Sequence, residues 1–171
     1  MKFKLTDMSN IADVISAVAI VISLIYVGLQ VSDNTRATRS ATANGATAIL
    51  VGVYSAASSS TESASVFHRG MTNPSLLDDG ERTQFIFMVH TAFLAFQNSY
   101  YLSKEGTLDI EVQASLTENI MAVKDQPGLK LYWTQRRAFL MKEFRNYVDV
   151  IIASEVKYEA SELYLSTGEK G

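Results

Sequence analysis

The sequence predicts an all-α protein in which one N-terminal transmembrane helix, extended beyond the bilayer, is followed by a helical bundle. Three observations favour this fold class. Residues 11–31 form an apolar run that matches the roughly 20 residues needed to cross a bilayer core of about 30 Å. Later segments repeat apolar residues at steps of three and four, which is the period of a helix. The chain of 171 residues has just 2 prolines, and no segment alternates for long with the period of a strand.

The apolar run at residues 11–31, IADVISAVAIVISLIYVGLQV, predicts a retained membrane span. A secretory signal would have a shorter apolar centre followed at once by a small-x-small cleavage site, and here residues 30–34 follow instead. A helix of a water-soluble bundle would keep a polar face, whereas residues 14–29 carry no charge. We therefore expect a short tail over residues 1–10 and a single-pass transmembrane helix over residues 11–31.

The charges beside the span leave its orientation open. Lys2 and Lys4 precede it, and Arg36 and Arg39 follow it. Orientation follows the excess of Lys and Arg on the cytoplasmic side, and these two counts are equal. The side of the membrane on which the C-terminal domain lies is therefore not predicted.

Small side chains form a stripe along the span. Ala12, Ser16, Ala19 and Ser23 recur at steps of four, three and four, which places them on one face of a helix. Small residues let helices approach closely in lipid, so this face is a candidate helix-packing interface. The alternative is that alanine and serine are simply common in membrane spans.

A second set of small side chains follows within residues 32–66, a stretch rich in alanine, serine, threonine and glycine. Ala41, Gly45, Ala48 and Gly52 again recur at steps of four, three and four. Its glycines and polar residues disfavour insertion as a second span. We expect a close-packing helix whose partner is another helix of this chain or the same helix of a neighbouring copy, with a Ser-rich linker over 55–65 as the alternative.

The remaining chain, residues 67–160, is expected to form the helical bundle. Asp78 and Glu81 read as the two halves of a capping box that starts a helix near residue 79. This helix, to about residue 102, is apolar on nearly every side, which favours burial in a bundle, although a second span at 85–102 stays an alternative. Gly106 is expected to end it.

Two further helices and a tail complete the predicted domain. One helix is expected over residues 110–123, and a last long one over residues 129–157. The core face of the last helix is marked by Leu140, Phe144, Tyr147 and Ile151, again at steps of four, three and four. Residues 161–171 are expected to fray.

The sequence predicts no catalytic residues, no metal site and no cofactor. There are no cysteines, and the 2 histidines are His68, in a stretch that looks like a loop, and His90, within an apolar helix. Neither histidine has a second histidine or a carboxylate three or four residues later, as a helical metal site would need. The formal net charge of −3 does not suggest a nucleic-acid partner.

Aromatic residues offer a different kind of candidate site. His90, Tyr100, Tyr101 and Trp133 are expected to border a pocket that accepts an apolar small molecule. The alternative is that aromatic side chains at helical spacing simply form the core.

The chain resembles a widespread group of uncharacterised bacterial single-span membrane proteins with a C-terminal helical domain. The similarity lies in ISAVAIVISLIYVGLQVSDNTRATRSA, ASVFHRGMTNPSLLDDGERTQF, FQNSYYLSKEGTLD and PGLKLYWTQRRAFLMKEF, which together cover most of the chain. The resemblance implies the architecture and a bacterial inner (cytoplasmic) membrane, but no activity. That group often has a glutamate where this chain has Gln97, so no role of that acid carries over.

Two classes of function follow from these features. The first is a non-enzymatic, membrane-anchored interaction or accessory protein that self-associates or joins a larger membrane complex through its small-residue faces. The alternative is a membrane-tethered sensor or ligand-binding bundle with an aromatic pocket. The expected partners are the lipid bilayer and a second copy or larger complex.

Overall fold

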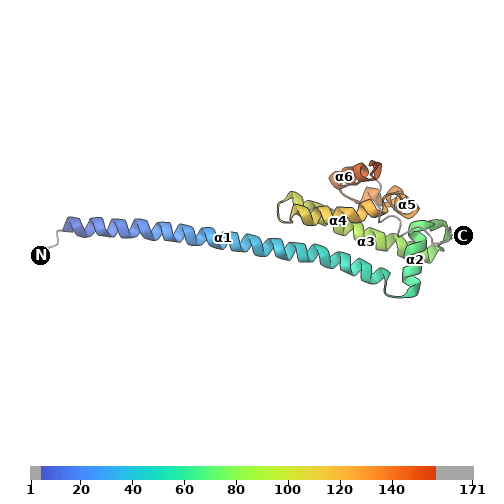
Figure 1. Cartoon of the computed structure of the whole chain (residues 1–171), viewed down its shortest axis with the longest axis horizontal. Helices are drawn as coiled ribbons and strands as arrows, with labels where there is room; N and C mark the ends of the chain where they lie inside the picture. Colours follow the sequence, from blue (N-terminus) through green and yellow to red (C-terminus); the bar gives the residue numbers. More distant parts are fainter. Residues whose placement is uncertain (1–4, 157–171) are drawn as a thin grey trace. The chain divides into compact units, whose positions relative to one another are not determined.

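The computed structural model describes residues 5–156, and the side chains from residue 12 onward. Within this range the chain is helical and has no strand, which confirms the predicted all-α class (Figure 1). The elements are α1 (Leu5–Ala57), α2 (Thr61–Thr72), the 3-10 turn η1 (Pro74–Leu76), α3 (Asp79–Lys104), α4 (Ile110–Val123), α5 (Pro127–Arg136), the 3-10 turn η2 (Arg137–Phe139) and α6 (Lys142–Ala153). The chain divides into two units, with the boundary between Ser40 and Ala41. The predicted tail at 161–171 lies outside the described residues.

The first unit contains the apolar part of α1. Its large apolar side chains between residues 14 and 31 are 52–66% exposed. In the described part of the chain, α1 is the one helix that is long and apolar enough to cross a membrane. A contiguous apolar surface of this kind is unfavourable in water and suits lipid or another protein.

The helix predicted over residues 32–66 is divided in two. α1 ends at Ala57, a short turn follows, and Ser60 caps the start of α2 by accepting a hydrogen bond from the backbone N–H of Ser63 at 3.0 Å. The hydroxyls of Ser58 and Ser59 donate to α1 carbonyls one turn earlier. Serine side chains compete in this way with helix continuation, which explains the break. The Ser-rich linker is therefore limited to residues 58–60.

α3 lies at the centre of the second unit, where it contacts α2, α4 and α5. Its buried side chains are Phe85, Ile86, Met88, Val89, Phe93, Ala95, Phe96 and Ser99. Burial against three helices explains most of the apolar residues at 85–102, whereas Phe87 and Leu94 are exposed. The capping box between Asp78 and Glu81 is present as predicted, and Gly106, with a φ of 72°, follows the end of α3.

The single long helix predicted over residues 129–157 is wrong. The chain instead forms α5, the turn η2 and α6. At the break, the side-chain oxygen of Gln97 accepts a hydrogen bond from the backbone N–H of Met141 at 2.7 Å. Leu140, Phe144 and Ile151 are buried as the pattern predicts, and Tyr147 is partly buried against the core. The spacing is kept because Phe144, Tyr147 and Ile151 all lie in α6.

Candidate functional site

The predicted small-residue stripe of the second unit lies on the surface. Ala41, Gly45, Ala48 and Gly52 are all exposed. A Cβ atom added to either Gly45 or Gly52 would meet nothing within 4 Å. Within the described residues, this stripe therefore has no partner in its own chain.

A different face of the same helix packs onto the bundle. Ala46, Leu50 and Ala57 are buried, at steps of four and seven residues. The hydroxyl of Tyr54 donates to the side-chain oxygen of Asn119 in α4 at 2.6 Å. The sequence gives little signal for this face, because Leu50 is its one bulky buried member and the small residues beside it form the more regular pattern.

The predicted stripe of the membrane span is also exposed. Ala12, Ser16, Ala19 and Ser23 are all exposed. The hydroxyl of Ser23 donates to the carbonyl oxygen of Ala19 at 2.8 Å, so this hydrogen bond stays within the helix. Because the Ser23 hydroxyl already donates within its own helix, contact with a neighbouring helix there would rely on close packing rather than on that donor.

The four residues expected to border an aromatic pocket do not form one cluster. His90 Nδ1 lies 2.9 Å from the hydroxyl of Tyr132, and the indole N–H of Trp133 donates to Asp149 Oδ1 at 2.8 Å. Tyr100 and Tyr101 meet edge to face, with their ring centroids 6.1 Å apart. The structure therefore joins the two tyrosines, but it does not gather all four residues around one cavity.

The pair formed by His90 and Tyr132 is neutral near pH 7. Burial lowers the pKa of His90, and the charge of Arg136 lowers it further. Burial raises the pKa of the Tyr132 hydroxyl, whose side chain is fully enclosed. Two neutral groups joined by one hydrogen bond are typical of a satisfied core contact.

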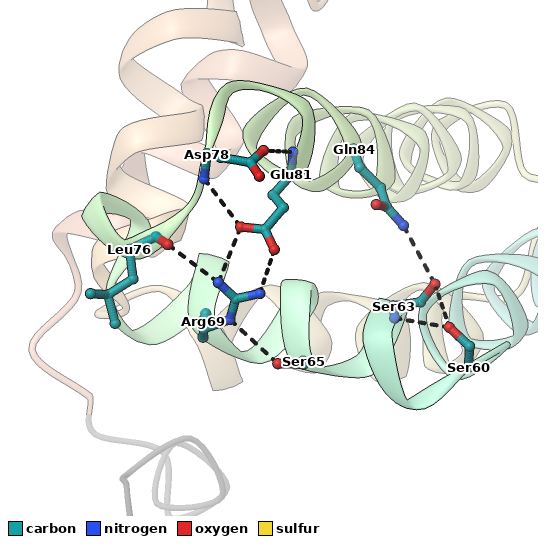
Figure 2. Close-up of polar contacts among 8 residues, drawn as sticks. All are labelled: Ser60, Ser63, Ser65, Arg69, Leu76, Asp78, Glu81 and Gln84. Carbon is teal, nitrogen blue, oxygen red and sulfur yellow. Dashed lines mark hydrogen bonds and ion pairs between the residues drawn. The ribbon is translucent and has the colours of Figure 1, made fainter.

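A charged clamp joins α2 to the start of α3 (Figure 2). The Arg69 guanidinium donates to both carboxylate oxygens of Glu81, at 2.6 and 3.1 Å. Glu81 also accepts from the backbone N–H of Asp78 at 3.1 Å, so one carboxylate completes the capping box and the ion pair. The hydrogen bond from Arg69, followed by the one from Asp78, lowers the pKa of Glu81. The sequence predicts Asp78 and Glu81 but not Arg69, which lies twelve residues before its partner.

His68 lies within α2 rather than in the predicted loop, since α2 runs to Thr72. Among the residues that the structure describes, no group of three or more His, Cys, Asp or Glu side chains could hold a metal ion.

The second unit contains a cavity of about 240 Å³ that the sequence analysis did not predict. Helices α1 to α5 all contribute to its lining. His90, Tyr100, Tyr101 and Trp133 are not among the residues that line it. Its members are spread from residue 50 to residue 129, so no local pattern in the sequence could have indicated it.

Comparison of the chain with protein-family models, with curated proteins and with solved structures found no match. The resemblance to bacterial single-span membrane proteins therefore stays a prediction.

Proposed function

We propose that this protein is a non-enzymatic, membrane-anchored interaction protein that self-associates through the small-residue faces of α1. The apolar part of α1 is the anchor, in a bacterial cytoplasmic membrane. The stripe formed by Ala41, Gly45, Ala48 and Gly52 packs against the same stripe of a second copy. The observation that carries the proposal is that this stripe is exposed while another face of the same helix is buried.

Glycine inside the helix supports a contact at this position. An interior glycine costs a helix about 1 kcal/mol relative to alanine. Gly45 and Gly52 meet no atom of the described chain that would require the lack of a side chain. A neighbouring helix that approaches the backbone closely would give both glycines a function and offset their cost.

The proposal is tested with the full chain extracted from native membranes in polymer-bounded lipid discs, followed by mass determination of the intact complex. We expect two or more copies of this chain in one particle. A monomer at every concentration would refute self-association. A particle that holds one copy with a different protein would also refute it, and would favour an accessory role in a larger complex.

A pair of variants tests whether the stripe is the contact. Gly45→Leu together with Gly52→Leu adds bulk to the stripe and raises helix propensity, so a loss of association would not result from a weakened helix. We expect the double variant to be monomeric. Thr47→Leu, at an exposed position of the same helix away from the stripe, is the control and should associate like the unchanged chain. A double variant that still associates would show that the contact lies elsewhere.

Orientation is measured separately, and the absence of cysteines makes the measurement simple. Thr134 is exposed on α5, so Thr134→Cys gives one accessible thiol in the bundle. Labelling by an impermeant maleimide in intact spheroplasts would place the bundle outside the cytoplasm. Labelling only after lysis would place it inside.

A further inference from the structure

The cavity in the second unit has a mainly apolar lining. Phe67, Met71, Met88 and Phe93 contribute side chains to it, together with Ala122 and several aliphatic residues. No Asp, Glu, Lys, Arg or His side chain lines it. A charged ligand would lose its hydration there without gaining an opposite charge, so the lining selects against ions.

The size of the cavity sets the size of a ligand. An apolar cavity of about 150 Å³ in a protein core stays dry and binds benzene. The cavity here is about 240 Å³. Scaled by volume from benzene, the cavity has room for a molecule of about ten non-hydrogen atoms, such as a fused pair of aromatic rings. A ligand that fills the cavity gains dispersion contacts with the side chains around it.

One polar pair interrupts the apolar lining. The Tyr54 hydroxyl donates to Asn119 Oδ1 at 2.6 Å, and the Asn119 amide donates to the backbone carbonyls of Ser115 at 3.1 Å and Leu116 at 3.3 Å. The donors of both side chains are therefore used, whereas the Tyr54 oxygen and Asn119 Oδ1 each keep capacity to accept another hydrogen bond. Tyr54 is 55% exposed, which places this pair toward the solvent side of the cavity.

We propose that the bundle binds a neutral, mainly aromatic or aliphatic small molecule of this size that carries one hydroxyl or N–H group. The apolar body fills the cavity among the phenylalanines and methionines, and the polar group donates to the Tyr54 and Asn119 pair. This site is independent of the proposed self-association, because it uses a different face of α1.

The first experiment uses the full chain in lipid nanodiscs, with 13C-labelled methionine methyl groups as reporters and 1-naphthol as the probe. Met71 and Met88 line the cavity, whereas Met141 is exposed on the surface. We expect saturable shifts of the Met71 and Met88 signals and no shift of Met141. Naphthalene-1-sulfonate, which has a permanent charge, should not shift them. No saturable shift with 1-naphthol, or equal binding of the sulfonate, would overturn the proposal.

Two variants test the binding position. Ala122→Leu fills part of the cavity and is expected to lower the affinity for 1-naphthol at least about tenfold, with the thermal midpoint retained because cavity filling is often stabilising. Ala114→Leu makes the same change at an exposed position of the same helix and should leave the affinity unchanged. Unchanged affinity in Ala122→Leu, or an equal loss in both variants, would overturn the proposed position.

A third variant tests the polar pair. Tyr54→Phe combined with Asn119→Leu removes both acceptors but keeps side chains of similar size. We expect the preference for 1-naphthol over naphthalene to fall about five- to tenfold, the effect of one lost hydrogen bond. A preference that stays unchanged would overturn the role of this pair. The mass of the membrane complex tests self-association separately, so either proposal can fail without the other.

Discussion

Gly128 in α5 lies against the backbone of Gly70 in α2, so closely that a Cβ atom at position 128 would be 2.1 Å from the Gly70 carbonyl oxygen. The next atom in its way would be the Cα of Met71, at 2.7 Å. Both obstacles are backbone atoms, so no side chain can rotate to make room. Glycine at position 128 is what allows these two helices to meet at this distance.

Gly128→Ala is therefore expected to lower the free energy of unfolding by about 3 kcal/mol, because α2 and α5 must separate to admit the methyl group. Thermal unfolding of the full chain in nanodiscs measures this change. Gly80→Ala is the control, since its nearest contact would be at an ordinary 3.4 Å from an Asp78 carboxylate oxygen. Equal stability of the two variants would contradict the close approach.

Acid should weaken the clamp between Arg69 and Glu81. The pKa of Glu81 is lower in the folded chain than its ordinary value of 4.5, so the folded state holds the charged form more tightly. The resulting stability is present above pH 4.5 and is lost as the pH falls through the lowered pKa. We expect Glu81→Gln to reduce the fall in thermal midpoint between pH 6 and pH 3. Glu105→Gln, at an exposed position, should not reduce it.

A second pH effect is expected at a higher pH, from His90. Its pKa lies below the ordinary value of 6.5 because burial disfavours the charged ring. The folded state therefore prefers the neutral ring, and this stability is present above pH 6.5 and is lost as the pH falls through the lowered pKa. His90→Gln should reduce the fall in thermal midpoint between pH 7 and pH 5. An unchanged slope would show that His90 does not carry this effect.

Asp149 is expected to stabilise the junction between α5 and α6. One of its carboxylate oxygens accepts from the Trp133 indole N–H, and the other pairs with Arg137. Trp133 is 7% exposed, so Asp149→Ala would leave a nearly buried donor without its partner, at a cost of about 1–3 kcal/mol. Asp149→Asn keeps an acceptor for the indole and should cost less. Equal losses in both variants would indicate that the ion pair, rather than the indole contact, matters.

Features with local signals were predicted well from the sequence. The long apolar helix, the Asp78 and Glu81 capping box and the glycine after α3 each depend on residues close together in the chain. The break between α5 and α6 could not be predicted in this way. At this break the Met141 N–H donates to the side chain of Gln97, which lies forty-four residues earlier in the chain. No glycine or proline between residues 129 and 157 marks the break.

The difference between local and long-range signals also explains which features of the candidate sites the sequence could predict. A regular spacing placed Ala41, Gly45, Ala48 and Gly52 on one face, but only the bundle's packing determines that Ala46 and Leu50 face inward instead. The aromatic pattern predicted a pocket near His90, Tyr100, Tyr101 and Trp133, but none of these residues lines the cavity. Their hydrogen bonds to Tyr132 and Asp149 form across elements, and composition does not indicate such pairs.

The cavity also has a consequence for how the second unit opens. Leu50, Val53 and Tyr54 border it, so the end of α1 forms fewer dispersion contacts than a helix packed against solid core. Segments with fewer buried contacts open at lower free energy, and their amide hydrogens exchange with solvent earlier. We expect residues 46–57 to exchange before α3. The helix that carries the proposed contact with a second copy would then be the first part of the bundle to detach, and pairing of two copies would slow its exchange.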